Sequence, residues 1–329
     1  MGRPSQIYPE DDVDQSSPRP LGALPKCQAC GRSDLTVVSF ATRPVRMGRC
    51  ETCGLRWLLD PPTGPELAEL YASGFYEPAP ARGGALVREL HRLNNAIRLR
   101  ELNGMEPGRL LDVGCGKGRF LAAASAAGWD ALGIEYAPAS AEAARAAYGV
   151  EVLVGDFLEL SVPGGFDAIT LWHVLEHLPD PAAAVARAAD LVRPGGRVVI
   201  SVPNIDSLQA DLGGERWFHL DLPRHLFHFS PRSLSALVER AGLQVVRIGH
   251  LYPEMEAIGL VQTTLNRAGF EDDLLYRFAK RDPSAPRGPR IYASLALALA
   301  TAPVAVAWSG IAPLLGTGAS IQLVAERPT

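Results

Sequence analysis

The sequence lacks the features that mark a secreted protein or a protein that binds nucleic acid. It has five cysteines among 329 residues, too few for a disulfide scaffold. Its formal net charge of −4 gives no general attraction to polyanions, and it contains no long basic patch. Residues 1–24 hold prolines and acids but no apolar run, so they predict a solvated leader instead of a signal peptide. The sequence therefore favours a cytoplasmic protein without a nucleic-acid partner.

The chain is long enough for one large domain and a smaller one. Its hydrophobic content of 47% and charged content of 21% are ordinary for a folded soluble protein. No internal repeat is evident. Changes in composition predict a leader (1–24), a zinc-ribbon-like segment (25–60), a helical linker or lid (61–105), a catalytic domain (106–250 and 317–329) and an apolar helical insert (251–316).

From Arg109 onward, short apolar segments alternate with alanine-rich segments, a pattern typical of α/β proteins. The expected strands are Arg109–Val113, Ala131–Ile134, Val150–Val154, Ala168–Leu171, Arg197–Val202, Gln244–Ile248 and Ser320–Ala325. The expected helices are 67–71, 86–97, Phe120–Ala127, Ala139–Ala147, Ala182–Leu191 and Pro231–Ala241. A tight turn at Pro194–Gly196 is expected to lead into the fifth strand. We predict a Rossmann-like, mostly parallel seven-stranded sheet with helices on both faces.

A glycine-rich loop follows the first of these strands and opens a helix. Its residues Asp112, Gly114, Gly116 and Gly118 read Asp-x-Gly-x-Gly-x-Gly. Glycine is needed where the backbone turns sharply and approaches a ligand more closely than a Cβ allows. A dinucleotide-binding fingerprint would instead have glycine at the position of Arg119.

Two acids follow the next two strands of the predicted sheet. Glu135 closes the second strand, where an ionised carboxylate can accept hydrogen bonds from both hydroxyls of a ribose. Asp156 follows the third strand, within Gly155-Asp156-Phe157. Three consecutive strand units therefore end in residues suited to one ligand.

These motifs, with the segments 172–178, 191–196 and 224–230, resemble class I S-adenosylmethionine-dependent methyltransferases of the ubiquinone-type, small-molecule branch. The resemblance covers about Arg109–Val246 and Ser320–Pro328. It implies S-adenosylmethionine as cofactor and a small-molecule methyl acceptor. It places Asp112 near the amino-acid part of the cofactor, Asp156 at the adenine amino group, and Tyr136 or Phe157 on the adenine ring. Trp172 is expected to join this cofactor site.

Two other functions remain open from the sequence. A nicotinamide-dependent oxidoreductase can share this fold class, although the glycine spacing opposes it. A nucleic-acid-binding module could be built on the cysteine segment, but the charge opposes that. The Asn/Asp-Pro-Pro-aromatic motif typical of base-amino methyltransferases is also absent after the fourth strand, where Trp172 and His173 stand.

His173, Glu176 and His177 form the sequence His-x-x-Glu-His, which also occurs in zinc proteases. A strand directly before the motif and prolines at Pro179 and Pro181 argue against the long helix that such proteases need. His173 is the first candidate for a general base, because imidazole titrates near neutrality. Alternatively, His173 only shapes the pocket and proximity drives the reaction.

Glu176 and His177 are expected to be structural. Related quinone methyltransferases carry an acid where His173 stands and are thought to bind a divalent metal, so the substitution puts that metal in doubt.

Basic and aromatic residues alternate in the segment before the helix at Pro231. The resemblance places this segment over the substrate pocket, with His225 as a second catalytic candidate. Exposed aromatic and basic groups would suit an aromatic, phenolic or anionic acceptor. A surface loop without a functional role is the alternative. The residues are Phe218, Arg224, His225, Phe227, His228 and Phe229.

Cys27-x-x-Cys30 and Cys50-x-x-Cys53 are separated by nineteen residues, a spacing typical of a four-thiolate zinc site. A glycine follows each pair, as tight turns at such sites require. Because four thiolates leave no open position, the zinc is expected to be structural. A redox dithiol or a sulfur-ligated cluster is the alternative. Cys115 is expected to be a small packing residue.

The insert contains no charged residue from Ile291 to Ala325 and is preceded by the basic residues Lys280, Arg281, Arg287 and Arg290. Residues 291–315 are long enough to span a bilayer, but the last strand must return to the same sheet. Pro303, Gly310 and Pro313 predict two short helices in a hairpin. This region (280–315) either makes peripheral contact with a membrane or is buried in the core or in a homodimer interface.

Overall fold

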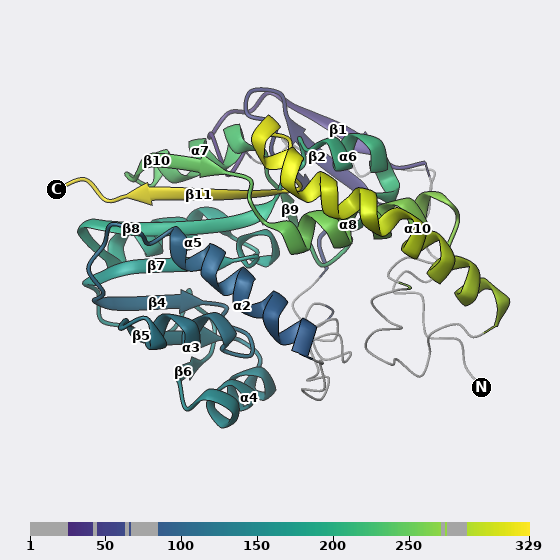
Figure 1. Ribbon diagram of the computed structural model, residues 1–329. Helices are drawn as coiled ribbons and strands as arrows, with labels where there is room; N and C mark the ends of the chain where they lie inside the picture. The colour runs from purple at the N-terminus through teal and green to yellow at the C-terminus, as the bar shows by residue number, and fades with distance from the viewer. Residues whose placement is uncertain (1–25, 42–44, 63–65, 67–84, 271–273, 275–287) are drawn as a thin grey trace.

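The structure is a computed structural model that describes residues 26–41, 45–62, 66, 85–270, 274 and 288–329. Its main feature is a seven-stranded sheet of order β10-β11-β8-β7-β4-β5-β6 (Figure 1). Only β11 runs antiparallel to its neighbours β8 and β10, so the predicted mostly parallel sheet is confirmed. The strands are β4 (Arg109–Val113), β5 (Asp130–Glu135), β6 (Glu151–Val154), β7 (Phe166–Trp172), β8 (Val192–Pro203), β10 (Gln244–Gly249) and β11 (Ser320–Glu326).

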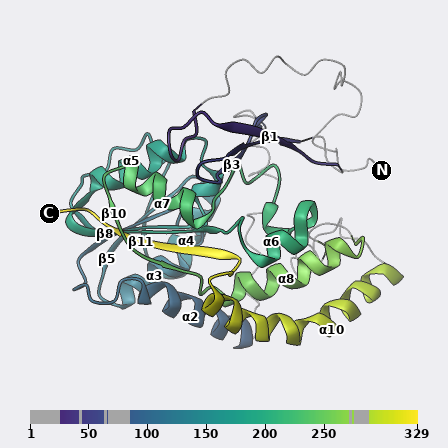
Figure 2. The ribbon, with the colours of Figure 1, turned by 90° about the horizontal axis from the view of Figure 1, so that it is seen from above.

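Helices cover both faces of this sheet, as predicted (Figure 2). The apolar residues of α5 and α7 pack on one face, and those of α2 and α3 on the other. The helix bounds are α2 (Ala85–Arg100), α3 (Arg119–Ala126), α4 (Pro138–Tyr148), α5 (Pro181–Leu191), α6 (Leu208–Gly213) and α7 (Pro231–Arg240). Short 3₁₀ turns follow at η1 (Leu175–His177), η2 (Gly214–Arg216) and η3 (Phe218–Leu220).

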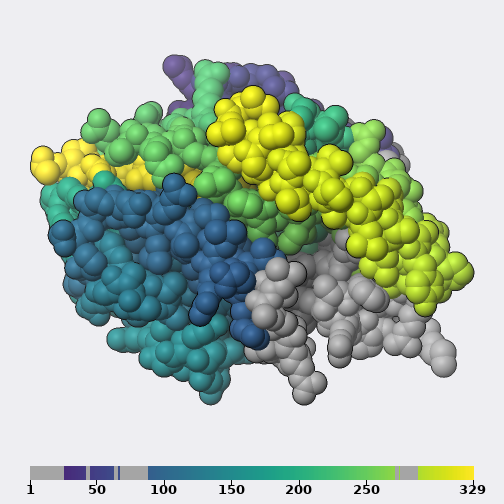
Figure 3. All heavy atoms as spheres, in the orientation of Figure 1, coloured from purple at the N-terminus to yellow at the C-terminus, as the bar shows by residue number. Residues whose placement is uncertain are grey.

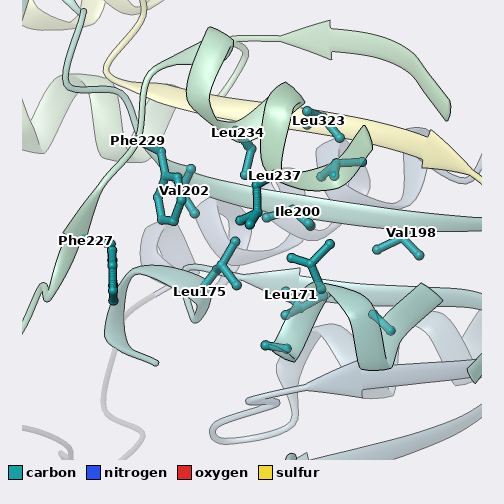
Figure 4. Packing of buried hydrophobic residues seen from close by; sticks show 14 of the residues in the cluster. Leu171, Leu175, Val198, Ile200, Val202, Phe227, Phe229, Leu234, Leu237 and Leu323 are labelled. Atoms are coloured by element: carbon teal, nitrogen blue, oxygen red, sulfur yellow. The ribbon is translucent and has the colours of Figure 1, made fainter. Parts of the chain in front are cut away.

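The core is organised by the alternation of side chains along β8. Val198, Ile200 and Val202 point to the face covered by α7 (Figure 4), whereas Val199 belongs to the cluster on the opposite face. All four side chains are fully buried. β8 begins at Val192, earlier than predicted, so Pro194–Gly196 lies inside it where its register against β7 shifts. The prediction of a turn before the strand was wrong in this respect.

A second sheet joins the cysteine-bearing segment to the rest of the chain. Its order is β1-β2-β3-β9, with β1 (Leu35–Ser39), β2 (Arg46–Cys50) and β3 (Arg56–Leu58) from the segment and β9 (Phe227–His228) from the segment before α7. Trp57 pairs with Phe227, and Arg56 pairs with His228. Main-chain hydrogen bonds therefore join the cysteine segment to the segment before α7.

The described part of the insert contains the helices α8 (Pro253–Arg267) and α10 (Pro289–Ile311), which pack together, followed by η4 (Ala312–Leu315). In Figure 2, α8 lies between α6 and α10. The expected return to the sheet is confirmed, because β11 follows η4 directly. The predicted hairpin within residues 291–315 is wrong: α10 continues through Pro303. A proline removes a single helical hydrogen bond, and here its ring lies on the exposed side of the helix.

Several predictions fall outside the described residues. These are the solvated leader at 1–24, the helix at 67–71, and the structure around Lys280, Arg281 and Arg287.

Candidate active site

A cavity of about 380 Å³ opens where the parallel strands β4, β5 and β7 end. In α/β sheets, ligands bind beyond the carboxyl ends of the strands. The residues predicted for the site that line this cavity are Gly114, Gly116, Glu135, Tyr136, Asp156, Phe157 and His173. The other residues predicted for cofactor binding or catalysis, Asp112, Gly118, Trp172 and His225, are not among its lining residues.

The three glycines of the loop all have positive φ, between 54° and 71°, which glycine adopts without strain. A Cβ on Gly114 would lie 2.4 Å from the Val174 side chain, and one on Gly118 would lie 2.8 Å from Cβ of Ala144. These two glycines therefore permit close packing. A Cβ on Gly116 would meet no atom within 4 Å, and Gly116 lines the cavity, so its glycine leaves space for a ligand.

Glu135 connects the glycine loop to the end of β5. Its Oε2 accepts a hydrogen bond from the Gly116 amide at 2.8 Å, and its Oε1 accepts one from the Ala137 amide at 2.9 Å. Each carboxylate oxygen can accept a further donor. The carboxylate thus orders the loop and still has acceptor capacity at the cavity wall.

Asp156, Phe157 and Tyr136 form the wall next to Glu135. Asp156 Oδ1 accepts from the Leu158 amide at 2.8 Å, which orients its carboxylate. Phe157 is buried, with the Arg187 guanidinium 5.3 Å from its ring centre, whereas Tyr136 is 60% exposed. A flat ring bound here could stack on the fixed ring of Phe157 and on the exposed ring of Tyr136.

Asp112 is buried beneath the glycine loop and accepts a hydrogen bond from the Thr170 hydroxyl at 2.7 Å. Burial raises the pKa of its carboxyl to about 7. Trp172, at the end of β7, is also buried and makes an edge contact with Phe120 at 5.2 Å between ring centres. Both side chains support the strand ends from within the protein.

His173 is the first residue after β7 and has φ of 55°, a left-handed conformation that is uncommon for histidine. Its Nδ1 lies 3.2 Å from Glu176 Oε1, and its Nε2 makes a longer contact of 3.4 Å with Ser201 Oγ. Glu176, predicted to be structural, is buried and holds the imidazole at the cavity wall. His177 lines the same cavity.

Two residues near His173 were not predicted. The Tyr252 ring, just before α8, makes an edge contact with His173 at 5.2 Å. Arg98 of α2 donates from Nε to the Tyr252 hydroxyl at 3.0 Å and lies 5.2 Å from the Trp172 ring centre. They come from the predicted linker and insert, which the resemblance does not cover.

The segment before α7 does not form the exposed surface that was predicted. Because β9 pairs with β3, its aromatic residues are enclosed, and Phe227 and Phe229 belong to the core (Figure 4). Arg224 forms an ion pair with Asp221. His225 is buried, and burial holds the pKa of its imidazole well below the usual range. Of the six predicted residues, His225, Phe227, His228 and Phe229 are therefore buried, and Phe218 and Arg224 are half-buried.

Glu176, His177 and His225 nevertheless come together. One ligand atom from each lies within 4.8 Å of the others, and Glu176 Oε2 is buried without a hydrogen-bond partner. His177 and His225 make an edge contact at 4.7 Å between ring centres. Two imidazoles and a carboxylate are a donor set that suits a divalent cation. The motif lies on the short η1 turn, which is unlike the long helix of a metallopeptidase.

The four cysteines predicted to bind metal also meet. Cys27 Sγ lies 3.5 Å from Cys53 Sγ, and Cys30 Sγ lies 3.5 Å from Cys50 Sγ. All four sulfurs lie within 4.8 Å of one another. Gly31 and Gly54 have φ of 74° and 79°, as the predicted tight turns require. Sulfurs around tetrahedral zinc are separated by about 3.8 Å, given a bond of about 2.3 Å.

Known proteins that are similar to this chain in sequence include methyltransferases. Residues 86–248 match a family model described as a methyltransferase domain. The chain is 32% identical over 182 residues to a ubiquinone biosynthesis O-methyltransferase of Xanthomonas axonopodis pv. citri, covering 50% of this chain and 76% of that protein. Proteins of the same name are 38% identical in Bordetella avium (48% and 72% covered) and 31% identical in Xylella fastidiosa (66% and 89% covered).

The raised pKa of Asp112 predicts how its replacement changes stability with pH. The folded pKa of about 7 exceeds the unfolded value of about 3.9, so the stabilisation by the neutral carboxyl is complete below about pH 4 and is lost as pH rises through 7. An uncharged amide at this position can still accept from the Thr170 hydroxyl. We expect Asp112→Asn to gain up to about 4 kcal/mol over the unmodified protein between pH 4 and pH 8.

Denaturant unfolding at a series of pH values measures this difference, with Asp130→Asn as the control because Asp130 is exposed. A difference that stays constant over this pH range would contradict the burial of an uncharged Asp112.

Proposed function

This chain belongs to the class I S-adenosylmethionine-dependent methyltransferases, and we propose that it methylates a hydroxyl group of a small aromatic molecule. The observation that carries this proposal is the position of His173. Its imidazole is held by a buried carboxylate at the wall of the cavity that the glycine loop forms. The relatives' description as O-methyltransferases supports oxygen as the acceptor atom.

The cofactor is proposed to occupy the cavity with its ribose at Glu135 and its adenine between Tyr136 and Phe157. Glu135 Oε1 and Oε2 each accept one amide hydrogen bond and can accept one hydroxyl as well. Asp156 lies on the same wall, where its carboxylate can accept from the adenine amino group. S-adenosylmethionine supplies an electrophilic methyl group, and the electron pair of the broken S–CH₃ bond stays on sulfur when the acceptor oxygen takes the methyl.

His173 is proposed to take the proton of the acceptor hydroxyl. In the tautomer with the proton on Nδ1, this nitrogen donates to Glu176 Oε1, and Nε2 is the acceptor nitrogen, whose 3.4 Å contact with the Ser201 hydroxyl would give way to the hydroxyl of the substrate. The hydroxyl proton moves to Nε2, and the buried Glu176 carboxylate stabilises the imidazolium that results. Tyr252 and Arg98 act as positioning residues, because the Tyr252 ring packs against the imidazole and Arg98 holds its hydroxyl.

A divalent cation would be held by Glu176, His177 and His225. These three residues fit a divalent cation. His177 and His225 can each supply an imidazole nitrogen, and the buried Glu176 Oε2 has no hydrogen-bond partner. Bound there, the cation would lower the pKa of a coordinated phenolic hydroxyl. A reaction that depends on His173 as the base needs no cation, whereas a reaction that depends on the cation should stop when a chelator removes it.

Zinc is proposed to hold Cys27, Cys30, Cys50 and Cys53 as a structural ion. The four sulfurs are close enough for shared coordination, and three of the side chains are almost fully buried. The Ser230 hydroxyl donates to the Cys53 carbonyl at 3.0 Å, and Arg240 Nη1 donates to the Gln28 carbonyl at 2.8 Å. Through these contacts the ion would stabilise α7 and the segment before it.

Cofactor binding should depend on Glu135 and Gly116. We expect Glu135→Ala and Gly116→Val each to weaken S-adenosylmethionine binding at least tenfold, which is about 1.4 kcal/mol or more. The first removes an acceptor for the ribose, and the second places a side chain in the cavity at a positive φ. Isothermal titration calorimetry measures both.

Glu142→Ala and Gly104→Val are the matched controls. Glu142 is an exposed acid on α4, and Gly104 has φ of 84° with open space around it, far from the cavity lining. Unchanged affinity in both test variants would reject the cofactor assignment.

Turnover should depend on His173 more than on His177. Asparagine tolerates the left-handed backbone at position 173, so His173→Asn removes the base with little strain. With a phenolic acceptor, we expect kcat to fall by about 10²-fold or more, and cofactor affinity to stay unchanged.

The same assay on His177→Asn, with and without EDTA, separates the base from the cation. A base at His173 predicts activity that survives EDTA. Activity lost on chelation, together with a larger effect at His177 than at His173, would contradict the proposed base.

Zinc should be present at about one ion per chain in protein purified without added metal. We expect Cys30→Ser to lower the free energy of unfolding by about 2 kcal/mol or more, because it removes one thiolate ligand. Cofactor affinity should be retained at temperatures where the variant is folded. Elemental analysis and thermal unfolding measure this, with Cys115→Ala as a control outside the cluster. Metal-free protein whose four thiols all alkylate freely would contradict the zinc site.

A further inference from the structure

Helix α10 carries two stripes of side chains with opposite exposure. The inner stripe faces α8 and consists mainly of small and hydroxyl-bearing residues: Ile291, Ser294, Ala298, Thr301, Ala305, Ser309 and Ala312. The outer stripe is exposed and consists mainly of apolar residues: Tyr292, Ala296, Leu299, Pro303, Val306, Gly310 and Leu314. Both follow the spacing of three and four residues that defines one face of a helix.

The hydroxyls of the inner stripe are satisfied within α10 itself. Ser294 Oγ donates to the Ile291 carbonyl at 2.8 Å, Thr301 Oγ1 to the Leu297 carbonyl at 2.9 Å, and Ser309 Oγ to the Val306 carbonyl at 2.7 Å. They require no water and no partner on another element. Small residues on this side also let α10 approach α8 closely.

The outer stripe leaves large apolar side chains in solvent. Leu299 is 74% exposed, Val306 64% and Leu314 85%. An 18-residue window within Pro289–Leu315 has a mean hydropathy of 1.8, yet only 22% of that window is buried. Figure 3 shows α10 on the surface along its length. Because Ile291, Leu295 and Trp308 lie on the buried or half-buried side, α10 is apolar on all sides, whereas a water-exposed amphipathic helix turns a polar side to solvent.

The packed helices α8 and α10 are fixed to the sheet on the side that faces the protein. Glu256 of α8 accepts hydrogen bonds from Gln209 Nε2 at 2.6 Å and from the Ala319 amide at 2.5 Å, just before β11. Glu256 is buried, and its hydrogen bond with Ala319 holds the start of α8 next to the start of β11. The chain therefore leaves the sheet at β10 and returns to it at β11 on the same side.

We propose that the outer face of α10 lies in one leaflet of a lipid bilayer, with the helix axis along the membrane surface. A helix of 23 residues is roughly 35 Å long, and no charged residue interrupts Ile291–Leu315. A protein partner is usually met by an apolar centre with a polar, hydrogen-bonding rim. The exposed residues of the outer stripe are apolar except for Tyr292, and basic residues precede the helix in the sequence and favour anionic headgroups.

Vesicle flotation with the full-length protein tests the docking itself. Vesicles of phosphatidylcholine with about a quarter phosphatidylglycerol supply the anionic surface. We expect the unmodified protein to float with them, and the double variant Leu299→Glu/Val306→Glu to partition at least about tenfold more weakly. Both positions are exposed, so the fold does not depend on them.

The control is Leu212→Glu/Val246→Glu, which adds the same charge at two exposed apolar positions outside α10 and should float normally. Calorimetry of S-adenosylmethionine binding verifies that every variant is folded and keeps this result separate from the methyltransferase proposal. Unmodified protein that stays with the unbound fraction would overturn the inference. So would a double variant that floats equally well, or a protein dimer that the double variant splits and that does not bind vesicles.

Discussion

The pairing of β11 between β8 and β10 is the constraint on which the arrangement of the other parts depends. It returns the chain to the sheet after the insert, so α8 and α10 must form a hairpin at one side of the molecule. The same pairing places Ala319 where its amide meets the buried Glu256. Because α8 starts directly after β10, the hairpin also brings Tyr252 to His173. One antiparallel strand thus links the sheet, the insert and the cavity.

The parts of the fold that the sequence predicted depend on local signals. Strand and helix periods, and the glycines that demand positive φ, are properties of a few neighbouring residues. They located the seven strands of the main sheet to within a few residues and placed Gly116, Glu135 and Asp156 at its carboxyl edge. The paired cysteines likewise predicted a cluster that the folded chain brings together.

The parts that sequence reasoning missed depend on contacts between distant segments. Nothing near His228 indicates that it will pair with Arg56 and become enclosed. The meeting of Arg98 with Tyr252 joins residues 154 positions apart, and His225 reaches Glu176 only through the packing of β9. Pro303 shows a different limit: its local propensity predicts a break, but packing of α10 on α8 outweighs the loss of one hydrogen bond.

The union of β3 with β9 also decides how the chain can be shortened. β9 has only two residues and no other strand beside it in the described part of the chain. A truncated protein that begins after the cysteine segment would expose the main chain of Phe227 and His228 as an open sheet edge, with the Phe227 ring uncovered. Such edges recruit strands from other molecules. A chain shortened in this way is therefore a poor candidate for crystallisation or engineering, even though it still contains the whole glycine loop and its acids.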